Sequence, residues 1–303
     1  MKLKEWGAFA LLGLVWGSSF LWIKIAVQEV GPFTLVVLRL SFGLAGLLIV
    51  MLWQKQPLPR DRRTLLAYLF MGVFNTAVPF TLISWGETKI DSGLASILNG
   101  TVPLFTIVIA NYWLHDEKIT LARLAGLVIG FIGVGVLVSR DFGLEGLTGN
   151  VWGQLAVLAA SGCYATAITF SRKHLRNQPP VVQALMTLLI ADAVMWAVTP
   201  AVEWPFHLPL LPLTWFAIAW LGLLGSCLAY LLFFYLINAW GPTRASLVTY
   251  VFPVIGLILG IIFLNEVADW RLIVGSLLVV GGIGAVNFVK PKPKPELAAG
   301  ATD

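Results

Sequence analysis

The stretch Ala95-Ser-Ile-Leu-Asn-Gly-Thr-Val-Pro103 recurs, in a diverged form, as Ala245-Ser-Leu-Val-Thr-Tyr-Val-Phe-Pro253. Each copy leads through an apolar segment to an acidic residue, Glu117 after the first copy and Glu266 after the second. The copies lie about 150 residues apart, half of the 303-residue chain, and this period is far too long for a solenoid repeat. The sequence therefore predicts a duplication of a whole half of the molecule.

The composition indicates a protein embedded in a lipid bilayer. Hydrophobic residues make up 58% of the chain and charged residues 12%, about half the usual charged share. Continuous apolar runs of about 20 residues recur along the chain, which is the length that crosses a bilayer as a helix. Strands of a membrane barrel would alternate polar and apolar residues, so these continuous runs favour helices.

The runs predict ten transmembrane helices, so the expected fold class is an all-α polytopic membrane protein. The basic start Met1-Lys-Leu-Lys4 resembles that of a signal peptide, but the apolar run after it is too long and lacks a cleavage site. Residues 291–303 begin with a Lys- and Pro-rich segment and are expected to form a disordered basic tail in the cytoplasm. The expected spans are 6–27, 33–53, 64–86, 92–114, 120–139, 150–172, 180–200, 212–238, 243–264 and 269–289.

Each half of the chain holds five expected spans, residues 1–140 the first five and residues 149–290 the last five. Because five is an odd number, the second half must enter the membrane upside down relative to the first. Inverted repeats are related by a pseudo-twofold axis in the membrane plane, and transporters built in this way bind substrate near the midplane. We therefore expect two inverted five-helix repeats around a central cavity.

The distribution of positive charge predicts the orientation. When the N-terminus is placed inside the cell, most Lys and Arg residues fall on cytoplasmic connectors. Both termini are then cytoplasmic, and the location is the inner or plasma membrane. The same connectors explain the net charge of +5, so no nucleic-acid partner is expected. Cys163 and Cys227 lie inside apolar runs without ligand-like spacing, so neither a disulfide, nor a metal site, nor a cofactor is predicted.

Several short motifs occur in a characteristic order: Trp16-Gly-Ser-Ser-Phe20, Arg39 within Leu38-Arg-Leu40, the two Ala-Ser…Pro stretches, and the glycine-rich segments 126–135 and 275–284. Together they resemble the EamA-type members of the drug/metabolite transporter superfamily, over about residues 6–289. The resemblance implies a five-plus-five inverted arrangement and the export or exchange of small metabolites such as amino acids. The second half reads Cys163-Tyr-Ala-Thr166 in place of the Trp16 motif, so the halves need not line the cavity equivalently.

Arg39 and Asp192 are the ionisable residues expected deep in the bilayer, where such groups are costly and face a cavity or a partner. Counted at about 1.5 Å per residue, they lie at matching depths in the second and seventh spans, so Asp192 is a candidate charge partner of Arg39. Arg39 is also a candidate site for a substrate carboxylate or a gating contact. A structural ion pair, or snorkelling toward the outer surface, would explain Arg39 equally well.

Aromatic and polar residues inside the bilayer complete the predicted site. Trp16 and Ser19 share one face of the first span, and Asn75 lies near the middle of the third. Aromatic walls with a few polar groups are typical of small-molecule sites. The predicted substrate-binding residues are Trp16, Ser19, Arg39, Asn75, Asn99, Tyr164, Tyr230 and Tyr250.

Pro103 and Pro253 would each free a backbone carbonyl inside a predicted helix. They are candidate hinges for alternating access, although a static kink would explain them as well. The glycine-rich faces of the fifth and tenth spans permit close backbone approach, so they are expected to pack against each other or against a second protomer. Glu117 and Glu266, directly before these spans, are expected to cap helix N-termini.

These features predict a secondary transporter that exports or exchanges a small neutral or zwitterionic metabolite, such as an amino acid, by alternating access. A lipid or lipid-carrier flippase is the alternative. An intramembrane enzyme is not expected, because it would need catalytic groups gathered at depth, and the three His residues fall in loops. The first span lacks an acidic residue between Trp6 and Val27, which argues against simple proton/cationic-drug antiport. The expected partners are the substrate and the bilayer, with the chain acting as a monomer or homodimer.

Overall fold

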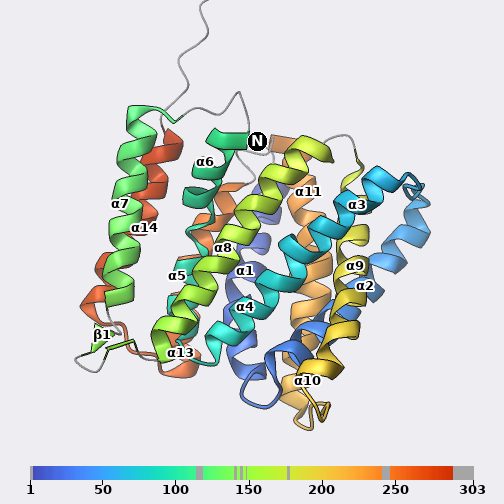
Figure 1. Cartoon of the computed structure of the whole chain (residues 1–303), viewed down its shortest axis with the longest axis horizontal. Coiled ribbons are helices and arrows are strands. Elements are labelled where there is room, and N and C mark those ends of the chain that lie inside the picture. Colours follow the sequence, from blue (N-terminus) through green and yellow to red (C-terminus); the bar gives the residue numbers. More distant parts are fainter. Residues whose placement is uncertain are drawn as a thin grey trace, which may run out of the picture.

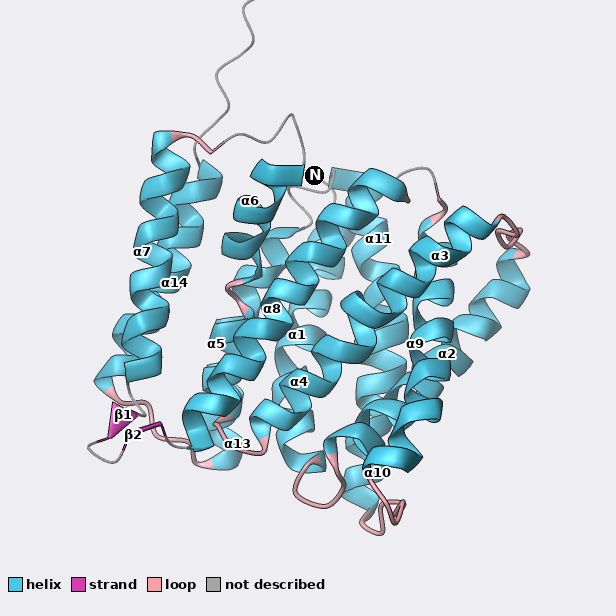
Figure 2. Ribbon diagram, viewed as in Figure 1, coloured by secondary structure: helices cyan, strands magenta, loops and turns pink. Residues whose placement is uncertain are grey.

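The computed structural model describes residues 3–113, 119–139, 142–143, 146–147, 149–175, 178–240 and 246–288. Glu117, Ala245 and the tail 291–303 lie outside the described residues. The helices lie side by side in one bundle, and a short antiparallel pair of strands, β1 (Phe142–Gly143) and β2 (Gly146–Leu147), lies at one end of it (Figures 1 and 2).

The first half contains α1 (Leu3–Ala26), α2 (Pro32–Gln54), α3 (Arg62–Met71), the π-helix η1 (Gly72–Ala77), α4 (Val78–Glu87), α5 (Ser92–Asn99), α6 (Val102–Trp113) and α7 (Leu121–Val138). The second half contains α8 (Gly149–His174), α9 (Pro180–Val202), α10 (Pro212–Ala219), the π-helix η3 (Trp220–Leu228), α11 (Ala229–Trp240), the 3-10 helix η4 (Ser246–Tyr250), α13 (Val251–Leu264) and α14 (Trp270–Phe288).

Seven helical segments are long and apolar enough to cross a membrane, which makes the protein an integral membrane protein. Three shorter apolar helices, Arg123–Val138, Val248–Leu264 and Trp270–Ala285, fall within the remaining predicted spans. The number of crossings stays a prediction. The seven segments are Leu3–Ala26, Pro32–Gln54, Arg62–Glu87, Ser92–Trp113, Asn150–His174, Pro180–Val202 and Pro212–Phe233.

The third and eighth predicted spans each pass through a π-helical segment, and the two segments lie at matching places in the halves. Each segment contains a glycine, Gly72 in η1 and Gly222 in η3, and these two glycines lie about 150 residues apart in the sequence. A Cβ on Gly72 would lie 3.1 Å from the backbone nitrogen of Ala191, and one on Gly222 would lie 2.6 Å from the carbonyl of Arg39. Glycine therefore lets η1 approach α9, and η3 approach α2, to backbone contact.

The fourth predicted span is not one continuous helix. It breaks at Gly100 and Thr101, between α5 and α6, and in the ninth span a 3-10 segment, η4, precedes α13. Pro103 and Pro253 therefore lie in the first turns of α6 and α13, where a missing N–H costs little. This corrects the expectation that each proline frees a carbonyl inside a helix. Their role as hinges stays a prediction.

The glycine-rich fifth and tenth spans pack against each other as α7 and α14, which confirms that expectation (Figure 1). A Cβ on Gly282 would lie 2.5 Å from the backbone nitrogen of Gly130, and one on Gly133 would lie 2.9 Å from the carbonyl of Gly275. The two helices therefore meet backbone to backbone, which only small residues permit.

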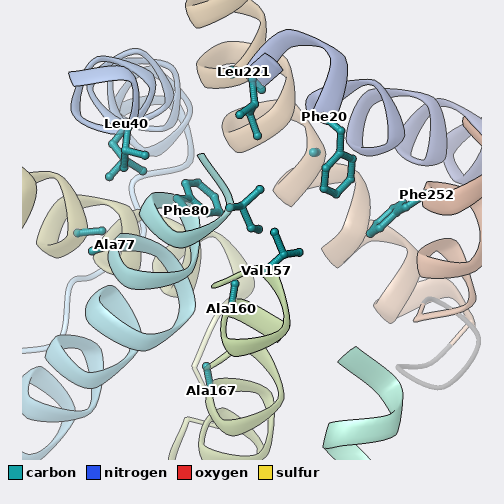
Figure 3. Close-up of a cluster of buried hydrophobic side chains, with 14 of the residues drawn as sticks. Phe20, Leu40, Ala77, Phe80, Val157, Ala160, Ala167, Leu221 and Phe252 are labelled. Carbon is teal, nitrogen blue, oxygen red and sulfur yellow. The ribbon is translucent and has the colours of Figure 1, made fainter. Parts of the chain in front are cut away.

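The core lies where helices of both halves meet. Phe20 of α1, Phe80 of α4, Val157 of α8, Leu221 of η3 and Phe252 of α13 gather there, and each is less than one-tenth exposed (Figure 3). Phe80 of this core lies against Arg39, the cation that the sequence singled out.

Candidate substrate site

Arg39 is held in the interior by an aromatic ring and a hydroxyl. Its guanidinium carbon lies 3.9 Å from the centroid of the Phe80 ring, and Nε donates to Oγ of Ser226 at 3.2 Å. The side chain is only 5% exposed. A cation over an aromatic face gains electrostatic energy, and the gain grows when water is excluded, so these contacts offset part of the burial cost.

The guanidinium has more hydrogen-bond donors than its described contacts use. Within the described residues, Ser226 is its hydrogen-bond partner, and an arginine offers five N–H donors. Gly225 separates Arg39 from Ser19: a Cβ there would lie 3.7 Å from Nη2 of Arg39 and 3.3 Å from Oγ of Ser19. The absent side chain leaves room beside the charged nitrogens.

Trp16 forms an aromatic wall next to this position. Its indole N–H donates to the carbonyl of Gly225 at 3.0 Å. Its ring lies 5.3 Å from Phe233, 5.6 Å from Phe252 and 6.4 Å from Tyr230, measured between centroids, the last two edge to face. Such contacts fix the orientation of a large apolar surface.

Polar groups complete the cluster. Nδ2 of Asn75 donates to the hydroxyl of Tyr230 at 3.2 Å, and Tyr164 and Tyr230 both interact electrostatically with Arg39. The structure thus brings together six of the eight predicted residues, from α1, α2, η1, α8 and α11, and we call these six the central cluster. They are Trp16, Ser19, Arg39, Asn75, Tyr164 and Tyr230.

The described contacts do not join the other two predicted residues to the central cluster. The hydroxyl of Tyr250 donates to the carbonyl of Ile283 on α14 at 3.2 Å, so it ties the start of α13 to α14. Asn99 ends α5 beside the break in the fourth span, and its buried Oδ1 has no hydrogen-bond partner among the described residues. Substrate contacts by Tyr250 and Asn99 stay predictions.

The predicted pairing of Asp192 with Arg39 is wrong in this conformation. Oδ1 of Asp192 accepts from Oγ of Ser41 at 2.9 Å, whereas Arg39 turns to Ser226. Arg39 and Ser41 are two residues apart, about 200° around the helix, so they point to nearly opposite sides of α2. Matching depth along two helices does not fix the direction in which each side chain points around its helix.

Two hollows lie away from the central cluster. One, of about 530 Å³, is an apolar groove between α6 and α7 lined by residues such as Val108 and Phe131. The other, of about 570 Å³, lies between α3 and α8 and combines Arg63, Lys173 and His174 with apolar residues. Because no cluster residue lines either hollow, the central cavity stays a prediction.

Three glutamates bridge the halves; sequence reasoning missed Glu203 and Glu29, and expected Glu266 to cap a different helix. Glu203 accepts from the backbone N–H groups of Phe33 and Thr34 at 2.9 and 2.8 Å. Glu266 accepts from the backbone N–H groups of Ser92 and Gly93 at 2.7 and 2.9 Å. Glu266 thus caps α5 of the other half rather than α14, whose start it precedes. The helices concerned, α2 and α5, have no side-chain cap of their own, which was the available signal.

The third bridge is Glu29, whose Oε1 accepts from the backbone N–H groups of Leu210 and Leu211 at 2.5 and 3.0 Å. Hydrogen bonds from the Thr214 side chain, and then from these two N–H groups, outweigh burial and hold the pKa of Glu29 below its ordinary value. A lowered pKa in the folded state means that this bridge stabilises the fold above the ordinary carboxyl pKa. The contribution is lost as the pH falls through the lowered value.

All three bridges lie at one end of the bundle, which we call the latch face. It consists of the connectors 27–31, 88–91, 203–211 and 265–269. There, Nζ of Lys24 also donates to the carbonyls of Glu87 and Ile90, both at 2.7 Å. Glu87, the last residue of α4, is itself fully buried, although the sequence did not single it out.

Membrane-spanning apolar helices around a buried cation and aromatic side chains define an integral membrane protein with an interior polar site. The model of the EamA-like transporter family matches residues 5–139 and 151–288. The chain therefore belongs to the EamA-like transporter family, and it is a transporter.

Similar proteins agree with this assignment. The uncharacterized transporter YoaV of Bacillus subtilis (strain 168) is 27% identical, over 93% of this chain and 96% of its own length. The uncharacterized inner membrane transporter YedA of Escherichia coli (strain K12) is 30% identical over 84% and 81%. A probable terminal-alkyne amino-acid exporter of Streptantibioticus cattleyicolor is 28% identical over 95% of each chain. One crystal structure, 20% identical, shares the fold with a TM-score of 0.66 over 94% of this chain and 96% of the other.

Proposed function

We propose that this protein is a secondary transporter that exports or exchanges a small zwitterionic metabolite of the amino-acid class by alternating access. The observation that supports this best is the buried guanidinium of Arg39. It has hydrogen-bond donors that its described contacts do not use, and it lies beside Gly225, which has no side chain to fill the space. Arginine binds carboxylates through paired, charge-assisted hydrogen bonds. Trp16 and Tyr230 provide apolar surface for the remainder of the solute.

The pattern of helix contacts supports the proposal of two inverted repeats, 1–140 and 149–290. In the first half α2 packs against α9 and η3, and in the second half α9 packs against α2 and η1. Likewise, α8 of the second half packs against α4, η1 and α6 of the first half. Its counterpart α1 packs against the corresponding elements of the second half, α11, η3 and α13. Exchanging the halves therefore maps these contacts onto one another. The two matches of one family model to the chain agree with this symmetry.

The latch face suggests which conformation is described. Three carboxylates there bond backbone N–H groups of the opposite half, so this end of the bundle is closed. With the termini in the cytoplasm, the latch face lies on the outer side. Opening it would separate the halves around the broken fourth span and around the ninth span, where Pro103 and Pro253 are the proposed hinges.

Counterflow into proteoliposomes tests the proposed function. Vesicles that hold the purified full chain and an unlabelled amino-acid mixture should accumulate labelled amino acid, and Arg39→Ala should reduce uptake at least tenfold while remaining inserted and folded. Absence of counterflow for every amino acid, or full activity of Arg39→Ala, would overturn the proposal. Lipid scrambling in the same vesicles, without amino-acid counterflow, would favour the flippase alternative.

A further inference from the structure

Glu87 is the most anomalous carboxylate among the described residues. It ends α4 with an exposed fraction of 0%, and both of its carboxylate oxygens lack a hydrogen-bond partner there. The bridging carboxylates Glu203 and Glu266, in contrast, each accept three hydrogen bonds. Buried polar atoms are nearly always paired, so an unpaired carboxyl group inside a membrane protein points to a missing partner.

The surroundings of Glu87 do not supply that partner. The charged groups that act on it electrostatically are Lys24 of α1, Arg39 of α2 and Glu266 before α14. The ammonium of Lys24 donates to the backbone carbonyls at 87 and 90, and Glu266 is bonded to the start of α5. Of the other elements that pack against α4, η1 and α5 contain no titratable residue. In α8 the basic residues Arg172, Lys173 and His174 lie in the last turn, whereas α4 meets α8 beside Glu87 at Gly153, and Tyr164, next to Cys163, interacts with Arg39.

Glu87 and the Arg39 site share one face of α4. Phe80, which lies under the guanidinium, precedes Glu87 by seven residues, so the two side chains point in nearly the same direction, roughly 10 Å apart along the axis. Ser84, between them on this face, is also buried. An α-amino acid carries its ammonium and carboxylate on the same carbon, so with charge-assisted hydrogen bonds of about 2.8 Å at both ends it would join charged groups that lie less than about 10 Å apart.

We propose that Glu87 binds the ammonium group of the transported solute in exchange for a proton, while Arg39 holds the carboxylate. The proposal rests on the proposed function and adds the coupling of solute export to proton import. On the cytoplasmic side the solute's ammonium replaces the proton of the Glu87 carboxyl, and that proton passes to cytoplasmic water. After the solute leaves at the opened latch face, the carboxylate takes a proton from the outer water. Each cycle thus exports one zwitterion and imports one proton.

The closed conformation fits this scheme. With no solute bound, a carboxylate without a hydrogen-bond donor is favoured in its neutral, protonated form, because burying an unpaired charge is costly. The transporter can therefore pass through the closed state without solute when Glu87 is protonated. Glu87 and the ammonium of the solute would form an ion pair only when the solute is present.

The test uses the full chain in liposomes loaded with the twenty radiolabelled amino acids, and compares efflux with and without an acidic exterior. The wild type should release label at least tenfold faster with the pH gradient, and Glu87→Gln should lose this acceleration. Glu87→Asp, which keeps the charge on a shorter side chain, should restore part of it. Asp61→Asn serves as the control, because Asn caps helix α3 as Asp does, and it should behave as the wild type.

A second measurement separates binding from folding. In the wild type, each amino acid should compete for counterflow at least tenfold better than its deaminated acid, and Glu87→Gln should lower this ratio to near one. If the wild type transports amino acids but Glu87→Gln keeps both the proton acceleration and the amine preference, Glu87 does not have this role and the proposed function stands. If the wild type transports no amino acid, the proposed function fails and this inference fails with it.

Discussion

Arg39 depends on neighbours that come from distant parts of the chain. Phe80 lies on α4, and Ser226 and Gly225 lie on η3, so the site forms only when α2, α4 and η3 meet. The sequence predicted Arg39 because a cation in an apolar run is conspicuous. Phe80 and Gly225 carry no such signal, since an apolar or small residue in a span is ordinary.

At the same scale, the substitution Arg39→Lys should reduce amino-acid counterflow at least tenfold, equivalent to about 1.4 kcal/mol. Lysine keeps the charge but loses the planar fork that can bond Ser226 and a carboxylate together and lie on Phe80. Arg63→Lys, at an exposed position on α3, is the matched control and should transport normally. Equal rates for Arg39→Lys and the wild type would show that charge alone suffices.

Two residue-level errors have the same physical origin. Asp192 was expected beside Arg39 but contacts the other side of α2 through Ser41, and Glu87 was left outside the third span, which was expected to end at residue 86. Hydropathy reports where a helix lies along the membrane normal. It says little about which way a side chain points or about one residue at a boundary.

At the level of the elements, the helix pair α7 and α14 depends on glycine at particular positions. Gly282→Val should destabilise the protein by about 1–3 kcal/mol, because a Cβ there would lie 2.5 Å from the backbone of Gly130. Thermal unfolding in detergent measures the loss. Gly281→Val is a matched control with the same helix propensity, since a Cβ at Gly281 meets no atom within 4 Å. A similar melting temperature for both variants would contradict the packing argument.

The latch face makes a second prediction for the elements. Glu266→Gln removes the negative charge that caps α5, and should cost about 1 kcal/mol locally. Hydrogen exchange at the amides of Ser92 and Gly93, which Glu266 binds, should then accelerate severalfold. Glu5→Gln is the control, because Glu5 accepts from Trp240 at the opposite end of the bundle. Unchanged exchange in Glu266→Gln would mean that the carboxylate does not hold α5.

Within the elements, the sequence predicted the apolar segments and the contact of the two glycine-rich helices. It did not predict the π-helical segments or the break after Asn99. The π-helical segments lie where backbones of the two halves touch, at Gly72 and Gly222, and the break lies where Gly100 meets the side chain of Pro253. A glycine in an apolar run does not reveal what it will contact. The notion of prolines kinking continuous helices failed for this reason.

For the whole molecule, the positive charge of the connectors predicts that both termini lie in the cytoplasm. A reporter active only in the cytoplasm should work when fused to either end, and one active only outside should fail at both. A fusion after residue 207, on the latch face, should show the opposite pattern and serves as the internal control. Activity of the two terminal fusions on opposite sides would refute an even number of crossings.

The break in the fourth span meets the ninth span inside the bundle. A Cβ on Gly100 would lie 3.0 Å from Cγ of Pro253, so the first turn of α13 rests against the gap between α5 and α6. We therefore expect bending of either span to displace the other, so that the two halves change conformation together. A carrier whose halves moved independently would at times open to both sides and let ions leak down their gradients. The contact between Gly100 and Pro253 thus helps to keep the membrane impermeable to ions during transport.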